Sequence, residues 1–315
     1  MTSKRFAIIA IILLAAFDLS AQNTKNLAEL LGYPKASKLL IIHADDMGLS
    51  QSVNAATLKA FSSKGITSGS IMVPCPWSGD IMKYLKEHPG PDVGIHLTLT
   101  AEWDTYRWDG ISSSDQIRSL LDSSGRFPRT VEELGKTAKG DEAYKELKAQ
   151  IDLAIKSGIN PTHIDTHMGS VLANPELVKV YLQLSEEYKL PILFPREYVG
   201  MLPKDVAAMF GSKIFLLDNL FMLDNSLIKG SWAESYRKGI ESLKPGLNQI
   251  IVHLAINNDE MKAICGGVDY GSEWRQKDLD FVTGNELKEM LKANNIKLIT
   301  WRQVGEAMRA MGEKK

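Results

Sequence analysis

Two adjacent carboxylates, Asp45 and Asp46, end an apolar run, Leu39–Ile42 with Ala44, that is interrupted only by His43 and has the composition of a buried strand. Burying a carboxylate is costly unless it is paired, hydrogen-bonded or bound to a metal. The alternative is an ordinary turn, in which one aspartate caps the helix predicted after Ser50 and the other is solvated. The pair by itself leaves both interpretations open.

Histidines supply the second signal, because four of the six lie in or at the end of predicted strands beyond the first: His96, His163, His167 and His253. In an extended strand His163, Asp165 and His167 share one face. Two histidines and one carboxylate with an open position are typical of a hydrolytic divalent-metal site, which lowers the pKa of a water toward about 7. The residues alone do not indicate which two histidines bind. A lone histidine at such a position is more often a hydrogen-bonded core residue.

The elements that must position these groups alternate between strand and helix. The predicted strands cover residues 39–44, 67–73, 92–100, 161–167, 191–194, 248–254 and 296–300. The predicted helices cover residues 50–64, 78–88, 131–156, 175–188, 286–293 and 304–311, and residues 196–245 read as helical without clear bounds. This alternation predicts an α/β fold with a parallel sheet, closed or nearly closed into a (β/α) TIM-like barrel that forms a single catalytic domain. A doubly wound open sheet is the alternative, and either fold places chemistry at the carboxyl ends of the strands.

The N-terminal residues are typical of a secretory signal peptide. Lys4 and Arg5 precede the apolar run Phe6–Phe17, and small residues follow up to Ala21. The run is short for a membrane span, although an uncleaved anchor is the alternative. We therefore expect a signal peptide over residues 1–21, a leader over 22–37 and the catalytic domain over 38–315. Export to the periplasm or the cell exterior follows, with no stable membrane span after cleavage.

The composition limits both the expected classes of partner and the residue types that could bind a metal. The formal net charge is −1, so there is no basic excess to favour nucleic acid. The two cysteines, Cys75 and Cys265, cannot form a cysteine-rich zinc site, so a metal must use histidine and carboxylate. The cysteines could form a disulfide or remain two buried thiols, and the sequence leaves homo-oligomerisation open.

Five motifs, taken in order, resemble the YdjC-like carbohydrate deacetylase family, which includes the chitooligosaccharide deacetylases. The motifs are Ala44-Asp-Asp-Met-Gly-Leu-Ser, Gly65-Ile-Thr-Ser-Gly-Ser with Met72-Val, Gly94-Ile-His-Leu-Thr-Leu-Thr, Pro161-Thr-His-Ile-Asp-Thr-His, and a histidine, His253, at the end of a late strand. The resemblance covers most of the chain, from about Lys38 to Val304.

The resemblance implies a distorted barrel with one divalent metal that removes acetyl groups from N-acetylated amino sugars or oligosaccharides. By motif position Asp46, His96 and His167 are the implied metal ligands. Asp45 is the implied general base for the metal-activated water, and His253 the implied general acid for the leaving amine. Zinc suits two imidazoles and a carboxylate, with magnesium or another divalent ion as the alternative. His163 and Asp165 are expected to lie behind the ligands.

The chain departs from the family pattern at two positions. Met168 follows His167, where the family usually continues with further histidines, and Leu254 follows His253, where the family usually has proline. The resemblance therefore defines neither the sugar nor whether the acetyl group is N- or O-linked.

Candidate substrate contacts come from a long predicted loop and from one arginine. Trp103 and Trp108 lie in the loop over residues 101–129, where an aromatic face could stack on a sugar ring or simply plug the loop. A further tryptophan, Trp274, is predicted in another loop. Arg196 follows a predicted strand and could contact substrate or orient Asp45, or it could be a surface arginine.

Two other functions fit parts of the pattern. A glycoside hydrolase on a similar barrel needs two carboxylates on different strands, roughly 5–9 Å apart, whereas Asp45 and Asp46 are adjacent. A non-catalytic carbohydrate-binding protein is compatible with the departures at Met168 and Leu254. Asp45 argues against it, because sugar binding requires no general base.

Overall fold

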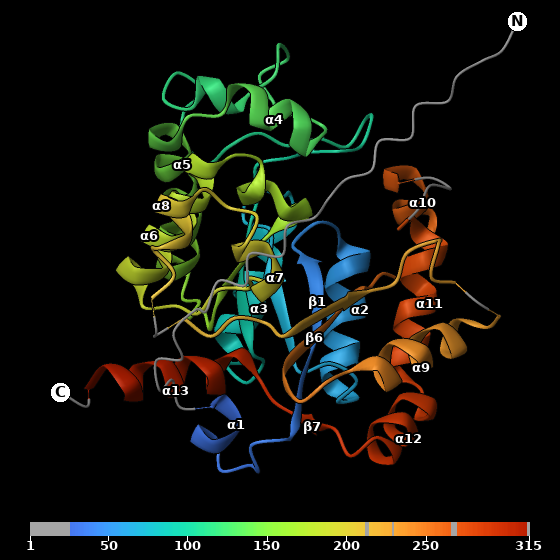
Figure 1. Cartoon of the computed structure of the whole chain (residues 1–315). Helices are drawn as coiled ribbons and strands as arrows, with labels where there is room; N and C mark the ends of the chain where they lie inside the picture. The colour runs from blue at the N-terminus through green and yellow to red at the C-terminus, as the bar shows by residue number, and fades with distance from the viewer. Residues whose placement is uncertain (1–25, 212–213, 229, 266–269, 314–315) are drawn as a thin grey trace, which may run out of the picture.

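The computed structural model describes residues 26–211, 214–228, 230–265 and 270–313 of the 315-residue chain (Figure 1). The predicted signal peptide lies outside the described residues. Within those ranges, no helix combines the length and the apolar character needed to cross a bilayer.

A parallel sheet forms the centre of the molecule. Its strands are β1 (Lys38–Met47), β2 (Ser68–Ile71), β3 (Val93–Leu97), β4 (Ile164–Thr166), β5 (Asn219–Met222), β6 (Gly246–His253) and β7 (Lys297–Leu298). The order is β4-β3-β2-β1-β6-β5, and the short β7 pairs with the beginning of β1. Every pairing is parallel, and the sheet curls into part of a barrel with helices around it. The predicted incomplete (β/α) barrel in a single domain is confirmed.

The central strand β1 is buried on both faces. Leu40 and Ile42 pack in one cluster with residues of helices α2, α9, α11 and α12. Leu39 and Ile41 alternate with them and pack in a second cluster, with Trp301 of the C-terminal helix. This double burial explains why β1 reads as a nearly continuous apolar run.

The helices connect the strands as the alternation predicts. They are α1 (Leu27–Leu30), α2 (Gln51–Ser62), α3 (Ser78–Glu87), α4 (Val131–Thr137), α5 (Gly140–Lys156), α6 (Pro175–Tyr188), α7 (Arg196–Val199), α8 (Lys204–Ala207), α9 (Trp232–Ser242), α10 (Asp259–Cys265), α11 (Ser272–Thr283), α12 (Asn285–Ala293) and α13 (Trp301–Glu313), with 3₁₀ turns η1 (Arg118–Leu120) and η2 (His167–Leu172). Ser50 caps α2, since its hydroxyl accepts the Val53 amide hydrogen at 3.2 Å.

Four expectations about the secondary structure need correction, and the first three concern the extent of predicted elements. The single helix predicted over residues 131–156 is interrupted at Ala138 and Lys139, whose backbone groups bond instead to the side chains of Asn174 and Ser119. The predicted strand 191–194 forms only an isolated bridge, between Ile192 and Ile164. The segment 196–245 is not wholly helical, because it contains β5.

The fourth correction concerns Trp274, which lies in helix α11 rather than in a loop and is buried. Its ring packs against those of Trp232 and Tyr270. The helix escaped prediction because eight of its twelve residues are polar, and several of these, including Arg275 and Asp278, are buried.

Candidate metal centre

The two adjacent aspartates reach the same site because β1 is irregular where they lie. Successive side chains of a regular strand point to opposite faces. Here the register between β1 and β2 shifts between Ala44 and Met47, and Asp46 has φ 71°. Such a conformation costs a non-glycine residue on the order of 1–3 kcal/mol and is maintained only by its surroundings. The carboxylates of Asp45 and Asp46 therefore both point toward His96, from which they lie 3.8 and 3.5 Å away.

Asp46, His96 and His167 form a buried set that could hold a metal ion. Asp46 Oδ1 lies 3.5 Å from His96 Nε2 and 3.3 Å from His167 Nδ1. Among the described residues, neither His96 Nε2 nor Asp46 Oδ1 has a geometrically aligned hydrogen bond, although both atoms are buried. Buried polar atoms are normally satisfied, so their convergence on one point fits a cation. Two imidazole nitrogens and one carboxylate oxygen are a donor set that zinc accepts.

The other nitrogen of each imidazole is held by a carboxylate. His96 Nδ1 lies 2.9 Å from Asp165 Oδ1, and His167 Nε2 lies 2.9 Å from Glu102 Oε2. Carboxylates in this position fix the tautomer and ring orientation of metal-binding histidines. Although burial opposes it, Glu102 and Asp46 raise the pKa of His167 to about 9.

A buried arginine, Arg275 of α11, lies against the outer oxygen of Asp46, with Nη2 2.8 Å from Oδ2. Burial disfavours ionisation of Asp46, but the charge of Arg275 and the close imidazoles of His167 and His96 hold its pKa well below the ordinary value. Asp46 is therefore a carboxylate. Sequence reasoning missed Arg275, because a single arginine in an unrecognised helix carries no spacing signal.

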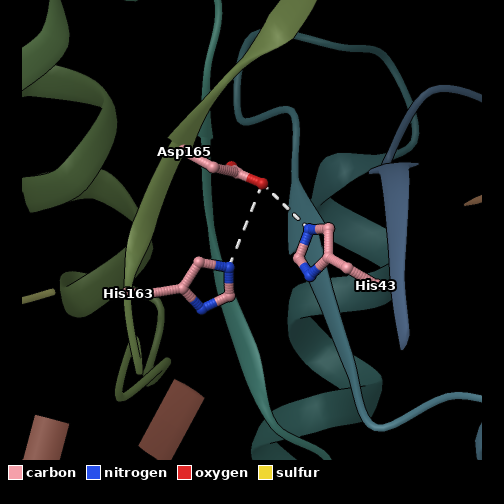
Figure 2. A group of neighbouring side chains, drawn as sticks. All are labelled: His43, His163 and Asp165. Carbon is pink, nitrogen blue, oxygen red and sulfur yellow. Dashed lines mark ion pairs between the residues drawn. The ribbon is translucent and has the colours of Figure 1, made fainter. Parts of the chain in front are cut away.

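His43 lies between Asp45 and Asp165, and Figure 2 shows its ring facing the Asp165 carboxylate. Its Nε2 lies 2.9 Å from Asp165 Oδ2, 3.2 Å from Asp45 Oδ1 and 3.1 Å from Ser70 Oγ. The Ser70 hydroxyl donates to Asp165 Oδ2 at 2.9 Å. Burial lowers the pKa of His43, but contacts with Asp165 and Asp45 outweigh it and raise the pKa to about 9. The Nε2 atom of His43 thus lies between two carboxylates, to which an N–H at this position can donate.

The group His43, His163 and Asp165 also has the residue types of a metal site. Both oxygens of Asp165 are already engaged, Oδ1 by His96 and Oδ2 by Ser70 and His43. His163 Nε2 lies farther off, 4.0 Å from Asp165 Oδ2, and its ring stacks on Trp301. This cluster supports the site from behind.

His253 completes the rim at the carboxyl end of β6. It is the register partner of Asp45 in β1, and its Nε2 lies 3.8 Å from Asp45 Oδ2. Burial lowers the pKa of His253, against the opposing charge of Asp46. Its backbone N–H donates to Asp278 Oδ2 at 3.1 Å, which fixes the end of the strand.

A cavity of about 1010 Å³ opens over these residues. Asp45, Asp46, His96, His167 and His253 all line it. Its remaining wall is largely apolar and includes Met168, Leu172, Leu193, Tyr198, Leu220, Met222 and Ile251. Met168, at the first departure from the family pattern, is partly exposed and has φ 53°. At the second departure, Leu254 is buried in the core.

The predicted substrate contacts separate into two groups. Trp103 lines the cavity, whereas Trp108 is buried beneath the loop, with ring centroids 5.8 Å from Trp103 and 6.1 Å from His167. Arg196 is 59% exposed, pairs with Asp218 at 3.0 Å and is not part of the cavity wall, so it does not contact Asp45. Cys75 and Cys265 are both buried and free.

The fold and this site define an incomplete (β/α) barrel with an Asp-His-His set at the carboxyl edge of its sheet. The family model described as YdjC-like protein matches residues 39–293. The chain belongs to this family.

Individual relatives agree with the family assignment. A carbohydrate deacetylase of Thermus thermophilus is 31% identical over 279 residues, which is 86% of this chain and 95% of the relative. A carbohydrate deacetylase of Brevibacillus brevis is 30% identical over 267 residues, or 84% and 99% of the two chains. A solved structure from Enterococcus faecalis V583, described as a cellobiose-phosphate cleavage protein, has a TM-score of 0.72 at 24% identity, over 85% of this chain and 99% of its own. That likeness shows the shared fold.

Proposed function

We propose that this protein is a metal-dependent hydrolase that removes acetyl groups from N-acetylated amino sugars or oligosaccharides. The observation that carries the proposal is the convergence of Asp46, His96 and His167 on one buried point, with Asp45 and His253 beside it. The carbohydrate deacetylases among the relatives support the same reaction class.

Asp46, His96 and His167 would hold the ion, and zinc fits their donor atoms best. When bound, a divalent ion supplies Lewis acidity that lowers the pKa of a water and polarises the acetyl carbonyl.

Two side chains, Asp45 and His253, would carry out the proton transfers. Asp45 Oδ2 faces the cavity and accepts a proton from the attacking water as the carbon–oxygen bond forms. His253 Nε2 delivers a proton to the sugar nitrogen as the carbon–nitrogen bond breaks, which leaves acetate and a free amine. Since burial lowers the pKa of His253, it starts neutral near neutral pH and must first gain the proton that it donates. Asp45 Oδ2, 3.8 Å away, is the nearest carboxylate oxygen that could return one.

The cavity wall fits a sugar better than a highly charged substrate. The exposed face of Trp103 can pack against the apolar face of a pyranose ring. Arg275 and Lys262 are the cationic side chains of the described wall other than histidines, and Arg275 is already paired with Asp46. Export through the predicted signal peptide belongs to the same proposal, and it would bring the enzyme to extracellular oligosaccharides. Mass spectrometry of the exported protein should show a chain that starts at Gln22.

The decisive experiment measures acetate release from a panel of N-acetylated oligosaccharides by zinc-loaded protein and by the Asp45→Asn variant. We expect zinc-dependent release by the wild type, a loss of about 10²–10⁴-fold in Asp45→Asn, and unchanged zinc stoichiometry. A variant that releases acetate as fast as the wild type would remove Asp45 as the base. Stoichiometric zinc without release from any substrate would contradict the deacetylase proposal.

A further inference from the structure

We propose that Glu102 is a positioning residue of the metal centre, which holds His167 in its ligand orientation and attaches the aromatic loop (residues 101–110) to the bound ion. The inference rests on the proposed function only in taking His167 as a metal ligand. It concerns a residue outside the recognised motifs, and its main readout is metal affinity, which does not require turnover.

His167 lies just beyond the end of strand β4, at the start of the turn η2. Strand β4 ends at Thr166, and the next residues, Met168 and Gly169, have φ values of 53° and 68°. The imidazole is oriented by side-chain contacts: Nε2 lies 2.9 Å from Glu102 Oε2, and Nδ1 lies 3.3 Å from Asp46 Oδ1. Glu102 accepts a hydrogen bond from the N–H at Nε2, which leaves Nδ1 free to bind an ion beside Asp46.

His96 provides an internal comparison. It lies within strand β3, and its remote nitrogen bonds to Asp165 of the neighbouring strand at 2.9 Å. Asp165 is thus a carboxylate supplied by the sheet. Glu102 makes the equivalent contact to His167, but it comes from a loop, and its side chain is 22% exposed. His96 is consequently held by a residue of the barrel sheet, whereas His167 is held by a residue of the loop.

The loop makes a second contact with the centre one residue further on. Trp103 has its ring 5.9 Å from the guanidinium carbon of Arg275, which pairs with Asp46 at 2.8 Å. Glu102 therefore contacts one proposed ligand, His167, and Trp103 contacts the partner of another, Asp46. Because Trp103 also lines the cavity, binding of the ion should order part of the substrate wall.

The test compares zinc affinity in the wild type, Glu102→Ala, Glu102→Gln and a matched control, Asp104→Asn. Asp104 lies in the same loop and also lines the cavity, but it is 84% exposed and pairs with Arg129 rather than with a proposed ligand. Zinc dissociation constants come from competition with a chromogenic chelator, and tryptophan fluorescence is followed during the same titration.

We expect Glu102→Ala to weaken zinc binding by about 10–100-fold and Asp104→Asn to leave it unchanged. Glu102→Gln, which keeps an acceptor oxygen but loses the charge, should lie between them. The zinc-induced fluorescence change should be smaller in Glu102→Ala than in the wild type, even at saturating zinc.

Two results would overturn the proposal. One is a zinc dissociation constant in Glu102→Ala within about twofold of the wild type. The other is an equal loss of affinity in the alanine and glutamine variants together with an equal fall in melting temperature, because a general loosening of the loop would then suffice. Neither outcome depends on acetate release, so failure of the deacetylase proposal remains distinguishable from failure of this one.

Discussion

Replacing Gly94 by alanine should destabilise the protein and distort the metal site, because Gly94 lies in strand β3, which also carries the proposed ligand His96. A Cβ at Gly94 would lie 2.5 Å from His163 Cε1 and 2.6 Å from both Nδ1 and the backbone oxygen of His163. Ordinary contact begins near 3.4 Å, so β3 and β4 would have to separate locally by about 0.9 Å. The Ile95 N–H to His163 oxygen bond (3.1 Å) and the Thr162 N–H to Val93 oxygen bond (3.0 Å) would then lengthen.

The expected loss of stability follows from the overpacking and from the lengthened backbone hydrogen bonds. Overpacking costs about 1–3 kcal/mol, and a weakened buried backbone hydrogen bond adds about 1 kcal/mol or more. We therefore expect Gly94→Ala to lose roughly 2–4 kcal/mol, which is on the order of 5–10 °C in melting temperature for a domain of this size. Since His96 lies two residues further along β3, zinc affinity should fall as well.

The assay is thermal unfolding followed by circular dichroism, with zinc affinity measured on the same samples. Gly79→Ala is the matched control, because a Cβ there meets nothing within 4 Å and its stability should be unchanged or slightly higher. Adding His163→Ala to Gly94→Ala should restore only part of the loss, because the backbone oxygen of His163 remains in the way. A Gly94→Ala protein that melts within about 1 °C of the wild type would refute the reasoning.

Two further perturbations test the charges around the site. Arg275→Met leaves Asp46 buried without its partner, so it should destabilise the zinc-free protein by about 3–5 kcal/mol in urea unfolding. Zinc should stabilise this variant more than it stabilises the wild type. Unchanged stability of the zinc-free variant would contradict this reasoning. Asp122 anchors the long loop through Arg107 at 2.7 Å; partial burial opposes ionisation, but hydrogen bonds from Ser124 and Arg107 lower its pKa to about 2. A depressed folded-state pKa stabilises the fold above the ordinary value of 3.8 and loses that contribution as the pH falls toward 2. Asp122→Asn should therefore lower stability by about 1 kcal/mol near neutral pH, and the difference should vanish in acid; a pH-independent difference would argue against the ion pair.

The residues that sequence patterns predicted are those whose position follows from the fold alone. Parallel strands bring their carboxyl ends to one edge, so Asp45, His96, His167 and His253 had to converge once the alternation was recognised. Burial on both faces made β1 recognisable, and the cap at Ser50 placed the start of the next helix. These features depend on local composition and on one architectural rule.

What the sequence could not reveal depends on contacts between distant segments or on local backbone geometry. Arg275 and Glu102 reach the site from a polar-looking helix and from a loop without periodicity. The positive φ of Asp46, which turns two consecutive carboxylates to the same side, cannot be predicted from the residue types around it. Arg196 was misjudged because its position after a strand resembles a rim position, whereas its side chain turns outward to Asp218.

The two aspartates divide their oxygens in the same way, and this division supports their different roles. Asp46 turns Oδ2 to Arg275 and keeps Oδ1 for the two imidazoles, at 3.3 and 3.5 Å. Asp45 turns Oδ1 to His43 and keeps Oδ2 toward His96 and His253, at 3.8 Å from each. Each carboxylate thus has a buried partner on its outer side, Arg275 for Asp46 and His43 for Asp45, and an oxygen on its inner side that faces the site. The free oxygen of Asp46 lies between two imidazole nitrogens, as a ligand must, and that of Asp45 lies between a ligand and the proposed acid, where a proton can be taken from water and passed on.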